Sequence, residues 1–111
     1  MPVSDENLPL YESLQEKRWQ LYLYSKRLFE YRDAATQFVI DPERAEVTLE
    51  LILIDGFMTD LNHNNPINFP SQAQFEALMA DVAILRGAIE SGASLSDLMG
   101  AGGAVLAAWP N

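Results

Sequence analysis

The chain has 111 residues, no cysteine and a formal net charge of −9, from 7 Lys and Arg against 16 Asp and Glu. This length allows one domain with its own core, and the lack of thiols excludes disulfides, zinc–thiolate sites and cysteine nucleophiles. The acidic balance argues against direct binding of nucleic acid, and no apolar run reaches the ~20 residues that a membrane span needs. Residues 1–7 lack a secretory signal pattern. We therefore expect a soluble, cytoplasmic protein with a flexible N-terminus, 1–7, and one helical domain, 8–111.

Apolar residues between 8 and 39 recur in the heptad pattern of helices that pack along one seam. The seam consists of Leu14, Leu21, Leu28 and Ala35 and, three residues after each of these, of Lys17, Tyr24, Tyr31 and Phe38. Lys17 is the only charged residue among them. The spacing predicts one long helix over about 8–39.

The next segment, 42–61, carries signals for two structures. Asp41 is a good N-cap and Pro42 a good first residue for a helix. The run 47–54 is instead rich in strand formers, so an α+β alternative with a hairpin at 37–54 stays open. If the segment is a helix, apolar residues lie nearly all the way round it, which is typical of a central buried helix or of an interface helix.

Two further helices are predicted from the signals at their ends. Ser71 is a good N-cap for a helix over 71–91, and Gly92 is well placed to end it. Ser94, with an acidic residue three positions later, begins a fourth helix over 94–108. The four segments together predict an all-α, four-helix bundle-like single domain.

Three glycines, Gly100, Gly102 and Gly103, lie inside the fourth predicted helix. Each weakens a helix by ~1 kcal/mol relative to alanine. In one interpretation they let another helix approach closely. In the other, the segment is a flexible arm that orders on a partner.

Residues that could carry catalysis are few. Asp60 and the single histidine, His63, have the i, i+3 spacing of a carboxylate–histidine half-site, which makes them weak metal-ligand candidates. A second candidate set for a small carboxylate–metal enzyme is formed by three acids at helical spacing, Glu43, Glu46 and Glu50. One such series supplies too few oxygen ligands for magnesium. We predict no catalytic residues and no cofactor.

The first helix is apolar on more than the side of its seam, which suggests an interaction surface. Trp19 and Leu23 lie four residues apart on the opposite side, and Tyr11, Tyr22 and Phe29 form a second stripe. Large apolar groups rimmed by charge mark interaction sites. The alternative is that a terminal segment or the fourth helix covers Trp19 and Leu23.

We therefore hypothesise that the chain is a non-enzymatic protein that acts in protein–protein interaction or assembly, as an adaptor does. We expect it to form a homo-oligomer, either a dimer or a larger assembly. Small proteins of this class occur among bacteriophage and bacterial accessory factors. The basic residues concentrate in the first predicted helix and the second half is weakly acidic, which could help two copies pack antiparallel. Two alternatives are an acidic inhibitor that mimics nucleic acid, motivated by the net charge, and the small carboxylate–metal enzyme.

Overall fold

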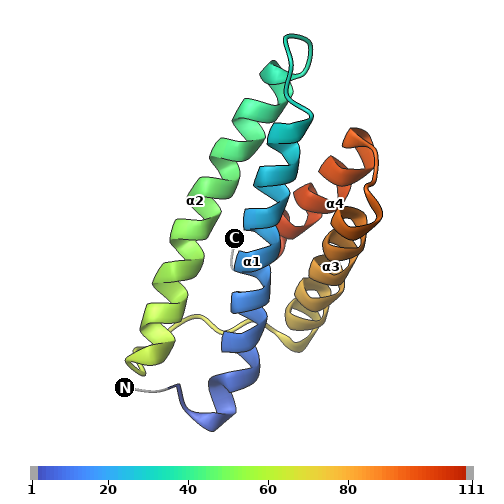
Figure 1. Ribbon diagram of the computed structural model, residues 1–111. Helices are drawn as coiled ribbons and strands as arrows, with labels where there is room; N and C mark the ends of the chain where they lie inside the picture. Colours follow the sequence, from blue (N-terminus) through green and yellow to red (C-terminus); the bar gives the residue numbers. More distant parts are fainter. Residues whose placement is uncertain (1–2, 110–111) are drawn as a thin grey trace.

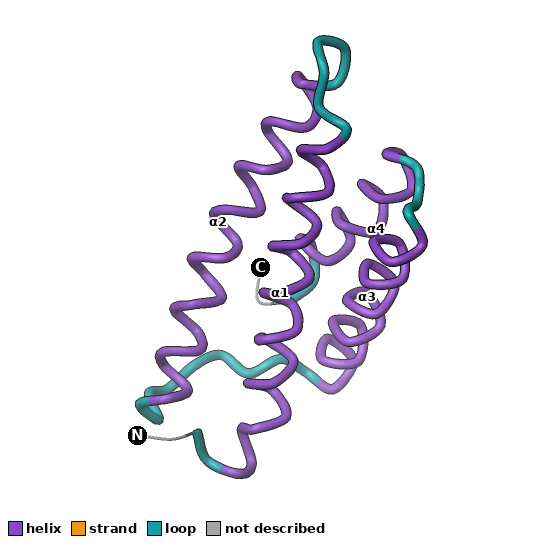
Figure 2. The backbone as a smooth tube through the Cα atoms, viewed as in Figure 1, coloured by secondary structure: helices purple, strands orange, loops and turns teal. Residues whose placement is uncertain are grey.

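The computed structural model describes residues 3–109, and within this range the chain forms helices joined by loops (Figures 1 and 2). The elements are a 3-10 turn, Asp5–Asn7, followed by α1 (Leu8–Glu30), α2 (Gln37–Asn62), α3 (Gln72–Ser91) and α4 (Leu95–Ala107). The predicted all-α, four-helix architecture is confirmed. The alternative hairpin at 37–54 is wrong, because that whole segment lies inside α2.

The other three helices pack around α1 (Figure 1). On one side α1 packs along α2, and on the other it packs against α3 and α4, which form a second helical hairpin. The core is made of the buried faces of all four helices, and its fully buried members on α1 are Leu14, Leu21, Tyr24 and Leu28. The result is an elongated bundle, 46 × 21 × 19 Å, in which α2 is an edge helix. Among the described residues, no helix combines the length and the apolar character needed to cross a membrane.

The first helix ends at Glu30 rather than near 39, because the following residues form a turn stabilised by their own side chains. The Asp33 carboxylate accepts hydrogen bonds from the backbone N–H of Ala35 at 2.8 Å and of Thr36 at 2.9 Å. These bonds lower the pKa of Asp33, the contribution of Thr36 being the largest. The Thr36 hydroxyl in turn donates to the Tyr31 carbonyl at 2.8 Å. Side chains of this type offer the backbone an alternative to the helix, which here interrupts the heptad pattern.

The second helix begins at Gln37, earlier than predicted, so Asp41 is not its N-cap and Pro42 lies inside it. The Asp41 carboxylate instead accepts two hydrogen bonds from the Arg32 guanidinium, at 2.7 and 2.9 Å, which join the turn to α2. Proline inside a helix removes one backbone hydrogen bond. Phe38, which the heptad pattern assigned to the first helix, is an exposed residue of α2.

The signals that predicted the ends of α3 and α4 are confirmed. The Ser71 hydroxyl accepts from the Gln74 backbone N–H, and the Gln74 side chain accepts from the Ser71 N–H, which is a complete capping box. Gly92 ends α3 with φ at 67°, a conformation that glycine adopts without strain. The Ser94 side chain accepts from the backbone N–H of Asp97 at 3.2 Å and caps α4.

The close approach of α4 to α1 explains why one of the three glycines of α4 has no side chain. A Cβ atom built on Gly102 would overlap Cζ, Cε1 and Cε2 of the buried Tyr24 ring on α1. The close-approach interpretation is therefore confirmed for Gly102. Gly100 and Gly103 have open space at the corresponding position. The fourth helix packs into the bundle and is not a free arm.

Candidate interaction surface

The predicted surface on α1 is exposed at its centre. Trp19 is 52% exposed and stacks on Tyr22, which is 43% exposed, with ring centroids 5.6 Å apart. The Lys26 ammonium lies 5.6 Å from the Tyr22 ring centroid. No described segment buries Trp19, so the alternative that another part of the chain covers it is wrong for residues 3–109.

The other three residues predicted for this surface lie elsewhere or are partly covered. Tyr11 is half-buried, and its hydroxyl accepts a hydrogen bond from the Asn62 side chain at 3.3 Å. Leu23 is also half-buried and packs against the core. Leu23 and the exposed Phe29 line a separate cavity of about 430 Å³, where the Arg44 guanidinium lies 4.7 Å from the Phe29 ring centroid. The five predicted residues thus do not all meet at one place.

A more continuous surface of apolar and small residues runs along the outward face of α2. Its positions alternate at spacings of four and three residues and are Phe38, Pro42, Ala45, Leu49, Ile52, Gly56 and Thr59. We call this series the outer seam. Every one of its positions is exposed, including Leu49 at 68% and Ile52 at 64%.

The outer seam exists because α2 has a second apolar face besides the one that its own bundle uses. Ile40, Val47, Ile54 and Leu61 recur every seven residues and are buried on the inner side of the helix. A helix at the edge of a bundle needs only this one stripe. The interpretation of α2 as a central buried helix is therefore wrong, and the outer seam is apolar surface that the monomer leaves unburied.

The inner side of α2 carries a buried ion pair that the sequence did not reveal. Lys17, fully buried on α1, donates a hydrogen bond to the Glu50 carboxylate at 2.7 Å. It also donates to the carbonyls of Trp109 at 3.0 Å and Ala108 at 3.3 Å, beyond the end of α4. Burial lowers the pKa of Lys17, and the contact with Glu50 opposes that shift. One ammonium group thus connects three helices, and it accounts for the charged residue in the heptad seam.

Three of the four acids named as catalytic candidates, Glu43, Glu50 and Asp60, have hydrogen-bond partners among residues 3–109. Glu43 accepts a hydrogen bond of 2.6 Å from the Tyr24 hydroxyl, and burial together with this carboxylate raises the Tyr24 pKa. Asp60 accepts from the Asn65 side chain at 3.2 Å, and His63 is the exposed residue that ends α2. Among residues 3–109, no three Asp, Glu or His side chains gather in a metal-binding arrangement. The half-site of Asp60 and His63 therefore finds no third ligand in the described part of the chain.

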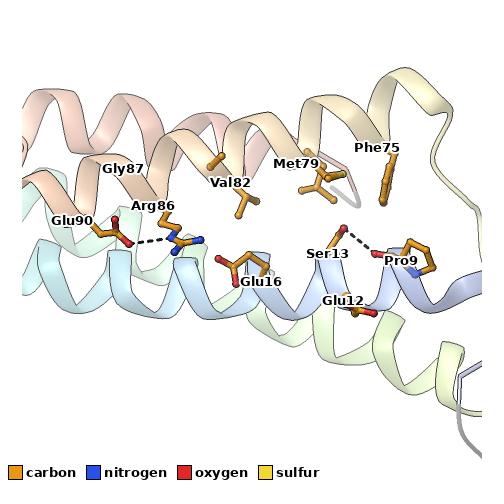
Figure 3. A pocket seen from close by; sticks show the side chains of 12 residues that line it. Pro9, Glu12, Ser13, Glu16, Phe75, Met79, Val82, Arg86, Gly87 and Glu90 are labelled. Carbon is orange, nitrogen blue, oxygen red and sulfur yellow. Dashed lines mark hydrogen bonds and ion pairs between the residues drawn. The ribbon is translucent and has the colours of Figure 1, made fainter.

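A groove of about 690 Å³ lies between α1 and α3 (Figure 3). Phe75, Met79 and Val82 of α3 face Ser13 and Glu16 of α1 across it. The Ser13 hydroxyl donates to the Pro9 carbonyl at 2.9 Å, which is a local helix contact and not activation by a base. This groove can accept an apolar side chain but holds no arrangement of nucleophile and base.

Apolar side chains are exposed on α1 and on α2, and others line the groove between α1 and α3. The outer seam is the longest of these surfaces, and the stacked pair of Trp19 and Tyr22 is a smaller patch on α1. Comparison with protein-family models, with curated proteins and with solved structures gave no match for this chain.

Proposed function

We propose that this chain is a non-enzymatic protein–protein interaction or assembly protein that self-associates through the outer seam of α2. The single observation that supports the proposal is the regular heptad spacing of the seam, all of whose positions are exposed. Sequences with this spacing bury the seam against another helix. An apolar stripe of this length on a monomer marks a site that a partner covers.

The free energy expected from burying the exposed apolar side chains of the seam supports self-association. Burying a Leu or Ile side chain completely stabilises by about 1.5–3 kcal/mol. Leu49 and Ile52, each about two-thirds exposed, would contribute from both copies of a symmetric pair. The large exposed residues Phe38 and Leu53 would add to this total.

An assembly or adaptor role agrees better with the charged groups than an enzymatic one. The Glu50 carboxylate accepts a hydrogen bond from Lys17, and the Glu43 carboxylate accepts one from Tyr24. These two carboxylates therefore stabilise buried side chains of α1. The outer seam is apolar and helical, which fits a helical protein partner. The acids beside it, among them Glu46 and Asp60, oppose contact with nucleic acid or an anionic membrane surface.

The mass of the particle in solution tests the proposal. We expect light scattering at micromolar concentration to give at least twice the 12.4 kDa mass of one chain. A charge placed in the seam, Ile52→Glu, is expected to weaken association at least ~100-fold, because an unpaired charge buried at the interface costs several kcal/mol. The fold should be unaffected, because Ile52 is 64% exposed in the monomer.

A matched control is available on another helix. Ile84 on α3 is 61% exposed and lies outside the seam, so Ile84→Glu changes the same residue type at nearly the same exposure. We expect this variant to keep the mass of the wild-type particle. A wild-type chain that stays monomeric, or equal loss of association in both variants, would contradict the proposed function.

A further inference from the structure

The outer seam is flanked on both sides by residues whose charges discriminate between the ways in which two copies could pair. The Asp41 flank lies toward α1 and consists of Asp41, Thr48, Asp55 and Asn62. The Glu46 flank lies on the other side and consists of Val39, Glu46, Leu53 and Asp60. A pairing deduced from these flanks rests on the proposed function and adds the identity and direction of the partner helix.

Three residues of the Asp41 flank already have side-chain partners within the same chain. Asp55 forms an ion pair with Arg18 at 2.7 Å, and Asp41 forms one with Arg32 at 2.7 Å. The side chain of Asn62 donates to the Tyr11 hydroxyl. This flank therefore presents carboxylates that have a cation beside them, whereas no ion pair is found at Glu46 or Asp60 among the described residues.

Parallel pairing of two α2 helices would bring opposite flanks together, because the two-fold axis then runs along the helices. Asp41 would lie opposite the second copy's Glu46, and Asp55 opposite the second copy's Asp60. Symmetry repeats both contacts, so each of the four flank acids would face another acid. The exposed ion pairs that Asp41 and Asp55 form with Arg32 and Arg18 offset this repulsion only in part. Like charges in such flanking positions oppose pairing.

Antiparallel pairing brings each flank against its own counterpart, and one register avoids all contacts between acids. In this register Leu49 lies opposite the second copy's Ile52. The facing flank residues are then Glu46 with Leu53, Asp55 with Thr48, Asp41 with Asn62, and Asp60 with Val39. The seam residues also match in size, because the small Ala45 meets the second copy's Gly56 on either side of the central Leu49 and Ile52 layers.

Shifting the antiparallel pair by one heptad in either direction restores the repulsion. One shift places Glu46 opposite the second copy's Glu46 and Asp41 opposite the second copy's Asp55. The other shift places Asp55 opposite its own counterpart and Glu46 opposite the second copy's Asp60. Of these three antiparallel registers, the one centred between Leu49 and Ile52 alone leaves the flanks free of facing acids.

We infer that the occupant of the outer seam is a second copy of this chain, paired antiparallel about a two-fold axis between Leu49 and Ile52. Such a contact is self-complementary, as a two-fold interface requires. Repulsion between the acids of the flanks then determines the direction and register in which the two α2 helices pair. Burial of the apolar seam residues stabilises the pair.

Single cysteines test the direction, because the natural chain has none. Ala45→Cys and Gly56→Cys both lie on the exposed seam, and a Cβ on Gly56 meets open space. We expect a disulfide between the two variants when they are mixed under mild oxidation and none in either variant alone. In the antiparallel pair two Ala45 positions are offset along the axis by about 16 Å, beyond the ~7 Å that a disulfide can span between Cα atoms.

A control variant separates specific pairing from random collision. Gly87→Cys on α3 is exposed, has open space for its side chain and lies outside the seam. Mixed with Ala45→Cys, it should form no disulfide on the timescale of the Ala45 and Gly56 pair. Equal crosslinking in both mixtures would overturn the inference, as would a disulfide dimer of Ala45→Cys alone, which indicates parallel pairing.

Light scattering of the wild-type chain distinguishes failure of this inference from failure of the proposed function. A dimer that forms the wrong disulfides overturns the antiparallel pairing and leaves self-association standing. A monomer overturns both, and it assigns the outer seam to a different protein or to none.

Discussion

Replacing Lys17 with methionine is expected to lower the free energy of unfolding by about 3–5 kcal/mol, because the change leaves the Glu50 carboxylate buried without its cation. Lys17 is fully buried, and the Glu50 side chain is only 8% exposed. The same substitution removes the donor that Lys17 offers to the Ala108 and Trp109 carbonyls, so the end of α4 loses a tie to α1. Urea denaturation followed by circular dichroism measures the loss.

Two further variants show whether burial is the cause. In the Arg18–Asp55 pair, the nitrogen–oxygen distance is also 2.7 Å, but both side chains are about half exposed. Arg18→Met should therefore cost no more than about 1 kcal/mol. Combining Lys17→Met with Glu50→Leu should recover much of the stability, because an apolar pair can replace a buried ion pair. Equal costs for Lys17→Met and Arg18→Met would show that the buried pair has no special role.

Gly102→Ala is expected to destabilise the protein by about 1–3 kcal/mol, although alanine is the better helix former. The added methyl group would overlap the Tyr24 ring, which has no free space because it is fully buried and its hydroxyl is bonded to Glu43. Either α4 must move away from α1 or the hydrogen bond to Glu43 must break. Thermal and urea denaturation measure the change.

The neighbouring glycine gives the matched control for this prediction. Gly103 lies in the same helix and has open space where a Cβ would stand. Gly103→Ala should stabilise the protein by up to about 1 kcal/mol, the usual gain in a helix interior. Stabilisation by both substitutions would contradict the close contact between Gly102 and Tyr24.

The helix ends that could be predicted from the sequence are those determined by local signals. The capping box at Ser71 and the left-handed Gly92 depend on a few adjacent residues, and α3 begins and ends where they indicate. The boundary between α1 and α2 could not be predicted in this way. The heptad spacing continues through the turn, and the bonds that Asp33 makes with the backbone outweigh it. Pro42 also indicated a start that lies five residues inside the actual helix.

The proposed interaction surface could be predicted only in part, because exposure depends on which neighbours a helix has. The sequence showed that α2 is apolar nearly all round, but not that it would lie at the edge with Leu49 and Ile52 turned outward. It located the exposed Trp19 on α1. The partnership of Lys17 and Glu50 joins residues 33 positions apart in sequence, and no local pattern encodes such a contact.

Isotope-filtered NMR on a mixture of labelled and unlabelled chains tests most directly whether the chain self-associates through the outer seam. Only contacts between different copies give signals in that experiment. We predict intermolecular contacts between the methyl groups of Leu49 and Ile52. Intermolecular contacts confined to Trp19 and Tyr22 on α1, or no intermolecular contacts at all, would contradict this assignment.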